Sequence, residues 1–325
     1  MHRNYDMKKI LFLLCIIGKM RFREAQSEQE FPFPADFKFG VTTSAFQIEG
    51  GWNISGKGQH IWDTVTHQNL TFIKDKQNGE KACDSYHLWK KDVELLNNLG
   101  VHFYRFSLSW SRLLPTGFSN HINLEAVQYY NSIINELLSF GIEPMVTLYH
   151  GDLPQPLQDM GGWPNPSLVP HYENYANVAF RLFGDRVKTW ITFNDPYEVC
   201  VSGYGTGNYA PGIVSPGISD YLCGKTILLA HAKAYKLYKQ HYYKKQKGGG
   251  GETDIIKKSI AHALQIQTVM LPPHSRRGYA RLCESESRKR RELSARVWRF
   301  SLYLVSRNVS PRHSSRALGE SVEVA

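Results

Sequence analysis

The stretch Trp190-Ile191-Thr192-Phe193-Asn194-Asp195-Pro196 decides the fold class of this chain. Alternating side chains over residues 187–193, rich in β-branched and aromatic types, predict a strand. Pro196 cannot donate to a sheet ladder, so we expect the strand to end before it. Asn194 and Asp195 then lie at the carboxyl end of the strand, where a β/α barrel places its chemistry. The alternative is an Asn-Asp-Pro turn that merely ends a strand.

Strand-like and helix-like patterns alternate four times along residues 37–243. The predicted strands begin at residue 37 and cover 101–110, 142–150 and 187–193, and the predicted helices cover 84–99, 124–140, 172–183 and 221–243. Alternation at this spacing predicts parallel strands with right-handed crossovers. Four such units fit either a doubly wound sheet or half of an eightfold barrel. The glycine-rich dinucleotide fingerprint and the P-loop pattern are absent, which disfavours nucleotide binding.

The charge of the chain is unevenly distributed. Residues 1–243 carry 22 Lys and Arg against 22 Asp and Glu, whereas residues 244–325 carry the remaining 17 and 7, and thus the whole excess of +10. A nucleic-acid binder carries its basic patch on a folded face, so we expect no nucleic-acid partner. Four glycines at 248–251 lead into the basic stretch, which shows no strand–helix alternation. We expect residues 248–325 to be a disordered or frameshifted tail.

The N-terminus predicts a secreted protein. Lys8 and Lys9 precede the apolar residues 10–18, which is the pattern of a secretory signal peptide. An N-terminal anchor or a buried strand is the alternative. The run is short for a bilayer span, and no other stretch could cross a membrane. Glycosylation sequons at Asn53, Asn69 and Asn308 agree with secretion.

The five cysteines show no metal-ligand spacing. Cys15 lies in the signal, and the other four are expected to be buried thiols or to form one disulfide, with no pairing assignable.

Polar side chains lie at or near the end of each predicted strand. Because the carboxyl ends of parallel strands meet on one rim, we expect a polar, carboxylate-bearing pocket there. Amides, histidine and tryptophan recognise hydroxyl-rich ligands by hydrogen bonds and by contact with the apolar ring face. The residues concerned are Gln47, Glu49, Arg105, Arg112, His150, Asp152, Asn194 and Asp195.

Four stretches, in this order, carry a resemblance to a known family. They are Phe-Lys-Phe-Gly-Val-Thr-Thr-Ser-Ala-Phe-Gln-Ile-Glu-Gly at 37–50, Tyr-Arg-Phe-Ser-Leu-Ser-Trp-Ser-Arg at 104–112, Tyr-His-Gly-Asp-Leu-Pro-Gln at 149–155 and Thr-Phe-Asn-Asp-Pro at 192–196. On these residues the chain resembles the family 1 glycoside hydrolases, the β-glucosidases, especially insect myrosinases and lactase-like enzymes.

The resemblance covers about residues 31 to 247 and implies an α/β fold of the (β/α)8 TIM barrel type, with about the first four β/α units present. We therefore expect a signal peptide and leader at 1–25, a partial glycosidase barrel at 26–247 and a non-homologous basic tail at 248–325.

The resemblance also implies roles for individual residues. Gln47 and His150 resemble the family's binders of sugar hydroxyls, and Asn194 resembles the amide that contacts the 2-hydroxyl. Asp195 stands at the position of the general acid/base, and Arg105 resembles the arginine that keeps the nucleophile ionised. Retaining hydrolysis needs two carboxyl groups ~5–5.5 Å apart and water, so no cofactor or metal is expected.

The sequence departs from the family pattern at the acid/base and the sugar site. Asp195 replaces Glu, which shortens the side chain by one methylene, and Gly151 replaces a tryptophan that forms an apolar wall of the sugar site. A smaller departure is Lys225-Thr226, where His-Asn is usual. The nucleophile block Thr-Glu-Asn-Gly occurs nowhere in the sequence.

Three interpretations stay open. The chain is a retaining β-glycosidase-family protein that acts on O- or S-linked β-glucosides and is impaired in this form, with a small-molecule β-glucoside as its partner. Alternatively it is a non-catalytic sugar-binding or receptor-like member of the family, or a non-functional gene-model fragment.

Overall fold

Four parallel strands form the centre of the computed structural model, which describes residues 33–246 except residue 35. The strands are β1 (Gly40–Thr42), β2 (Phe103–Ser107), β3 (Glu143–Tyr149) and β4 (Thr189–Phe193). They lie in the sheet in the order in which they occur along the chain, and every neighbouring pair is parallel. Thr42 pairs with Arg105, Arg105 with Met145, and Met145 with Thr189. The predicted β/α alternation is confirmed, with the sheet order of consecutive β/α barrel units.

Long helices follow the strands and return the chain to the opposite end of the sheet. They are α4 (Ser85–Asn98), α6 (Leu124–Ser139), α8 (Leu168–Phe183) and α10 (Ser219–Leu237). The Asn123 side chain accepts a hydrogen bond from the backbone N–H of Glu125 and caps α6, as predicted. Gly100 and Gly141 adopt φ values of 68° and 73° just after α4 and α6, the left-handed conformation that glycine adopts readily.

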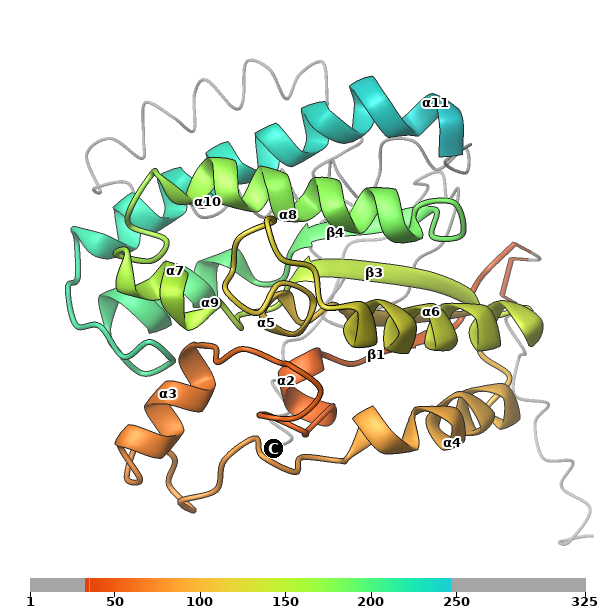
Figure 1. The fold of residues 1–325 in the computed structure, drawn as a ribbon, viewed down its shortest axis with the longest axis horizontal. Helices are drawn as coiled ribbons and strands as arrows, with labels where there is room; N and C mark the ends of the chain where they lie inside the picture. Colours follow the sequence, from red (N-terminus) through yellow and green to blue (C-terminus); the bar gives the residue numbers. More distant parts are fainter. Residues whose placement is uncertain (1–32, 35, 247–325) are drawn as a thin grey trace, which may run out of the picture. The chain divides into compact units, whose positions relative to one another are not determined.

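Short helices occupy the carboxyl end of the sheet. They are α2 (Ala45–Ile48), α3 (Ile61–Gln68), α5 (Trp110–Leu113), α7 (Gln155–Asp159) and α9 (Pro196–Cys200), each of which comes after a strand along the chain. Figure 1 shows α3, α7 and α9 gathered at one end, on its left side. The carboxyl ends of β1 to β4 are thus covered by short helices and loops.

The sequence did not predict α3. Its N-terminus is closed by a capping box in which the His60 side chain accepts from the Asp63 N–H and the Asp63 carboxylate accepts from the His60 N–H. The recognisable form of this motif begins with Ser or Thr, so a histidine in that place gave no signal. The turn expected after β1 is likewise the short helix α2. The predicted helix over 221–243 is α10 followed by the π-helical turn η2 (Tyr238–Tyr242) and by α11 (Tyr243–Gln246).

Aromatic rings fill the space between the sheet and its helices. The rings of Trp110 and Tyr175 stack with centroids 4.5 Å apart and an interplanar angle of 5°. Tyr172 stacks on Phe193 at 4.5 Å, and its hydroxyl donates to the Thr192 carbonyl. The first contact joins α5 to α8, and the Tyr172 contacts fix α8 against β4, the strand that carries Asn194 and Asp195 at its end.

One disulfide joins Cys200 at the end of α9 to Cys223 in α10. Cys83 is a free, exposed thiol, so of the alternatives left open by the sequence, one disulfide is present. Among the helices of the described residues, none is long and apolar enough to cross a membrane. The expected signal at 1–25 and the expected tail at 248–325 lie outside the described residues.

Gly40 allows Phe103 to pack across the sheet. A Cβ at Gly40 would lie 2.4 Å from the Phe103 ring, and Phe103 is buried. Gly40→Ala should therefore lower the free energy of unfolding by about 1–3 kcal/mol through overpacking, measured by urea titration. Shortening the ring with Phe103→Leu in the Gly40→Ala background should recover part of this loss. Additive losses in the double variant would contradict the explanation.

Candidate active site

The carboxyl ends of β2, β3 and β4 bring together Arg105, Thr147 and Asn194. Arg105 lies within β2, is 5% exposed, and donates from Nε to the Thr147 hydroxyl at 2.9 Å. Its Nη2 donates to the Asn194 amide oxygen at 2.7 Å. The buried guanidinium thus fixes the Asn194 side chain and leaves its NH2 group to face a ligand.

Asp195 follows Asn194 in an unusual backbone conformation. Its φ of 36° and ψ of 59° lie in the left-handed region, which aspartate tolerates better than most residues and which is enriched at functional sites. Pro196 occupies the first turn of α9, where its missing N–H costs nothing. The side chain of Asp195 is exposed and makes no capping hydrogen bond. Its carboxylate is therefore available to a ligand.

His150 closes the strand β3 with a neutral imidazole. Burial, together with the nearby positive charge of Arg105, lowers the pKa of His150 from 6.5 to about 3. Its Nδ1 is buried without a hydrogen-bond partner. At neutral pH the ring can thus exchange one donor and one acceptor with ligand hydroxyl groups, but it cannot supply a positive charge.

Gln47 lies on α2 and is exposed. Its amide oxygen accepts a hydrogen bond from the Ser44 hydroxyl at 2.7 Å, which orients the side chain and leaves the NH2 group as a donor. Gln47, His150, Asn194 and Asp195 thus come from the carboxyl ends of three different strands, as the sequence predicts. No described contact joins Gln47 to the other three.

Glu49 and Arg112 form a separate, buried ion pair. The Arg112 Nε lies 2.8 Å from the Glu49 carboxylate, with side chains 0% and 6% exposed. The other Glu49 oxygen accepts from the Tyr130 hydroxyl at 2.7 Å. This pair joins α2 to α5 and α6 and holds the segment that carries Gln47.

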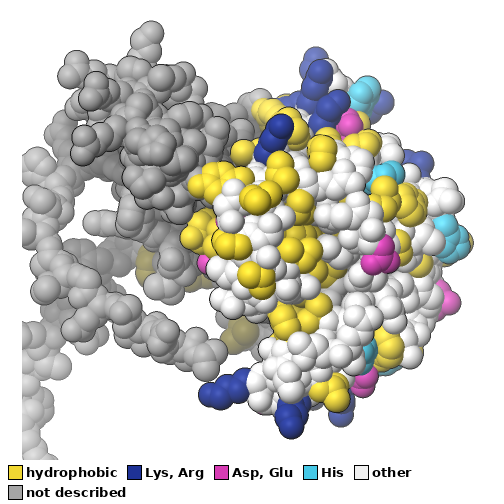
Figure 2. Space-filling model, turned by 90° about the vertical axis from the view of Figure 1, so that its left-hand side faces the viewer, with side chains coloured by type: hydrophobic (Ala, Val, Ile, Leu, Met, Phe, Trp, Pro, Cys, Tyr) yellow, Lys and Arg dark blue, Asp and Glu magenta, His cyan; other side chains and the backbone are white. Residues whose placement is uncertain are grey.

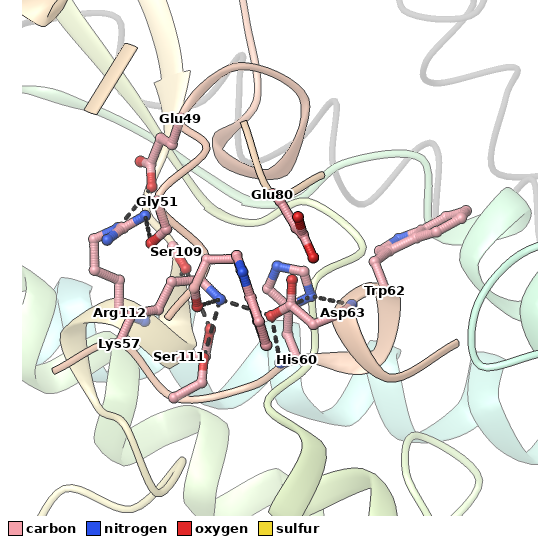
Figure 3. Close-up of polar contacts among 12 residues, drawn as sticks. Glu49, Gly51, Lys57, His60, Trp62, Asp63, Glu80, Ser109, Ser111 and Arg112 are labelled. Atoms are coloured by element: carbon pink, nitrogen blue, oxygen red, sulfur yellow. Dashed lines mark hydrogen bonds and ion pairs between the residues drawn. The ribbon is translucent and has the colours of Figure 1, made fainter. Parts of the chain in front are cut away.

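A second buried pair lies beside the first. The Lys57 ammonium is 2.7 Å from the Asp63 carboxylate, and both side chains are less than 5% exposed. Burial lowers the pKa of Lys57 and brings that of His60 well below its usual value. Figure 3 shows the two pairs together with Ser109 and Ser111.

The cavity among these charges is too small for a sugar. It has a volume of about 10 Å³ and is lined by Glu49, Lys57, His60, Asp63 and Arg112, among others. That is room for about one water molecule. The polar groups predicted at the rim differ in their surroundings. Glu49 and Arg112 pair with each other in the interior, whereas Gln47 and Asp195 are exposed and His150 and Asn194 lie at the ends of β3 and β4. Within the described residues, no cluster of three His, Cys, Asp or Glu side chains is placed to hold a metal ion.

Asp152 is a buried carboxyl group next to His150. It is 1% exposed, its Oδ1 accepts from the His150 N–H at 3.4 Å, and its Oδ2 has no partner. Burial raises the pKa of Asp152 from 3.8 to about 7. The folded protein therefore holds a proton at mildly acidic pH that the unfolded chain has already lost.

The free energy of unfolding should fall as pH rises from about 4 to 7 because of Asp152, and this contribution should be absent above pH 7. Between pH 5 and pH 7 the loss should be about 2–3 kcal/mol. Asp152→Asn, a neutral side chain of the same shape, should remove it. The buried histidines act in the opposite direction in both proteins, so the difference between wild type and variant isolates Asp152.

Urea unfolding at pH 5 and pH 8 measures this difference. Asp159→Asn on the exposed side of α7 removes the same charge from the surface and is the control. A pH dependence in Asp152→Asn equal to that of the wild type would contradict the assignment of a neutral Asp152.

Comparison with known proteins agrees with the fold. Residues 29–258 match Glycosyl hydrolase family 1. Myrosinase 1 of Brevicoryne brassicae is 50% identical over 219 residues, which are 67% of this chain and 47% of that protein. Human lactase/phlorizin hydrolase is 49% identical over 216 residues, 66% of this chain and 11% of that protein.

Solved structures give the same result. An aphid myrosinase superimposes with a TM-score of 0.66 at 45% identity, over 71% of this chain and 53% of that structure. A β-glucosidase from Thermotoga maritima in complex with castanospermine gives 0.63 at 41% identity, over 67% and 48%. The chain thus spans about half the length of the aphid protein that it matches. The match over most of this chain, the parallel sheet and the residues at its carboxyl end together show that the chain belongs to glycosyl hydrolase family 1.

Proposed function

We propose that this chain binds β-glucosides at the carboxyl end of its sheet. Any catalysis by the chain is hydrolysis of O- or S-linked β-glucosides with retention of configuration. The observation that carries the proposal is the Asn194 amide, held by Arg105 at 2.7 Å next to the exposed Asp195. A preorganised amide beside an unpaired carboxyl group is suited to a sugar hydroxyl next to the bond that is cut. The relatives' names, myrosinase and β-glucosidase, support the same substrate class.

In this proposal Asp195 is the general acid/base. Retaining hydrolysis proceeds when one carboxyl protonates the leaving group while a carboxylate attacks the anomeric carbon, and water then releases the sugar. Asp195 would donate the proton in the first step and take one from water in the second. Asn194, Gln47 and the neutral His150 would hold the sugar hydroxyls. The sequence contains no Thr-Glu-Asn-Gly block to supply the nucleophile, so hydrolysis by this chain is expected to be impaired.

A non-catalytic sugar-binding function is the second candidate. It is favoured by the same two observations, the aspartate at position 195 and the missing nucleophile block. Both functions need β-glucoside binding, and they differ in whether substrate is turned over.

Asp195→Glu tests the catalytic role. The longer side chain should bring the carboxyl nearer the glycosidic oxygen, because a misplacement of ~1 Å can cost ~10²-fold in rate. An alkyl β-glucoside needs a proton on its leaving group, whereas an aryl thioglucoside does not need full protonation. In a protein completed with the missing half of the barrel and its nucleophile block, the value of kcat/KM should therefore rise about 10- to 100-fold for the alkyl substrate and less for the thioglucoside.

Equal gains for the two substrates would show that Asp195 has no acid role. Calorimetric binding of both glucosides without turnover in either variant would favour the non-catalytic function. Asp159→Asn is again the control, because it changes an exposed carboxyl outside the site.

We also propose that the protein is secreted and N-glycosylated. The apolar run at 10–18 after Lys8 and Lys9 supports export, and the Cys200–Cys223 disulfide is typical of an oxidising compartment. Asn69 is exposed at the end of α3, and its side-chain oxygen accepts from the Thr71 hydroxyl at 2.8 Å. Both residues of this sequon are therefore accessible.

Expression in a secreting eukaryotic cell should give protein in the medium that loses mass on treatment with a peptide N-glycosidase. Thr71→Ala should abolish the glycan at Asn69, whereas Thr71→Ser should keep it. Retention of the protein inside the cell, or an unchanged mass, would contradict the proposal.

A further inference from the structure

The sheet has two open edges within the part of the chain that the structure describes. There, β1 pairs only with β2 and β4 pairs only with β3. The Thr43 N–H donates to Arg105 on β2, and the Asn194 N–H donates to β3. In a parallel sheet, successive residues of a strand direct their backbone groups to opposite sides, so those of Thr42 and Phe193 point to the open edges. Such unpaired N–H and C=O groups are a template for another strand.

The helix beside the β1 edge, α4, carries a second apolar stripe. One flank of α4 packs on α6, where the ring of Tyr86 lies 4.6 Å from that of Tyr129. By helical spacing, Leu88, Leu95 and Leu99 share the opposite flank. These three leucines are 45–69% exposed. The flank of α4 that is turned away from α6 is therefore apolar and uncovered.

The helix beside the β4 edge, α10, has the same property. Tyr238 at its end packs on Phe180 of α8 with ring centroids 5.0 Å apart. Ile218, Leu222 and Leu229 lie on the opposite side by helical spacing and are 44–65% exposed. Figure 2 views the end of the molecule at which α10 begins, and hydrophobic side chains gather there over one area of the surface. A helix that is apolar on opposite sides is normally buried between neighbours.

Figure 1 shows α4 and α10 on the outer sides of the helices α6 and α8. Each open edge of the sheet is thus accompanied by an apolar stripe on the adjoining helix. The stripes are Leu88, Leu95 and Leu99 beside β1, and Ile218, Leu222 and Leu229 beside β4. A partner that covers one edge must therefore present both a strand and an apolar helix.

The charges beside the two stripes show which helices can meet. Lys225, Lys233 and Lys236 border the stripe of α10, whereas Asp92 and Lys91 border the stripe of α4. Two α10 stripes would repel each other. Asp92 lies between the first two leucines of its stripe, and Lys225 lies between the two leucines of the other. A parallel alignment of α4 with α10 brings this carboxylate and this ammonium group to the same level.

A second copy of the chain supplies what both edges need. Four parallel strands are half of an eight-stranded barrel, whose interior side chains fill. Two solved structures of the family match this chain over 53% and 48% of their own length, which agrees with that proportion. Rotation by half a turn about the barrel axis places β1 of each copy beside β4 of the other and α4 beside α10, with all strands parallel. This closure leaves no open edge.

We propose that this chain forms a two-fold homodimer in which β4 of each copy pairs with β1 of the other and α10 of each copy packs on α4 of the other. The eight strands then close into one barrel. Both copies present Asn194 and Asp195 on the same rim, because all strands point the same way. Dimerisation needs no ligand, so it does not depend on the proposed function.

The mass of the full-length chain in solution tests the dimer. Light scattering and sedimentation should give twice the 37.2 kDa of one chain. Leu95→Glu and Leu229→Lys should each raise the dissociation constant of the dimer roughly 10²-fold, since both contacts then bury an unpaired charge and each loses about tenfold. An equal mixture of the two variants should dimerise again. In the mixed dimer one contact keeps both leucines, and the other sets Glu against Lys.

Leu138→Glu is the matched control, because Leu138 is 41% exposed on α6, away from both edges. The control variant should dimerise like the wild type. Its dissociation into monomers, or a mixture of the two edge variants that stays monomeric, would overturn the inference. A monomeric wild type would also overturn it and would show that another part of the same chain covers the edges. A mass that keeps growing with concentration would indicate open head-to-tail addition and would contradict the closed dimer.

Amide hydrogen exchange tests the pairing of the strands directly. The N–H groups of Thr42 and Phe193 should exchange slowly in the wild-type dimer and faster in Leu95→Glu, because they lose their partner strand. Exchange at these two amides that is equally fast in both proteins would mean that the copies associate without joining their sheets. That result would overturn the proposed barrel even if the mass is that of a dimer.

Discussion

The Arg105 guanidinium at the centre of the sheet is the interaction on which the site depends. It extends from β2 to a hydroxyl on β3 and to an amide at the end of β4. A buried guanidinium is tolerated only when its donors find partners, so these hydrogen bonds hold three strands in one register. A slip of one residue in any strand would turn Arg105 or its partners to the other face of the sheet. The same contacts that satisfy a buried charge also place Asn194 and, through it, Asp195.

The charged groups at the rim show how the molecule separates support from ligand contact. The ion pairs Glu49–Arg112 and Lys57–Asp63 are removed from solvent. Such pairs add little net stability but fix geometry, since breaking one leaves a buried charge unpaired. They anchor α2 and the loop that leads to α3. Gln47, which is exposed on α2, thereby gains a defined position without being part of the charged network.

Much of the fold could be predicted from the sequence because it rests on local periodicity. The strands, the Asn123 cap and the glycines after α4 and α6 are each visible within a few residues. The candidate site residues could be found for the same reason, because they lie at or near the ends of the predicted strands. The pairing of Glu49 with Arg112 joins residues 63 positions apart in the sequence, and no local pattern indicates it. The α3 helix was missed because its capping box begins with histidine.

The disulfide between Cys200 and Cys223 has a consequence for how the protein is handled. It joins two cysteines 23 positions apart in the sequence and closes a loop that begins five residues after Asp195, so a covalent bond borders the end of β4 where Asn194 and Asp195 lie. A chain made in a reducing bacterial cytosol would lack this bond and would gain conformational freedom in that loop. Protein from such a source and protein from an oxidising secretory route would then differ in the conformational freedom of this loop, although their sequences are identical. The expression host is therefore an experimental variable for this site, on the same footing as temperature or pH.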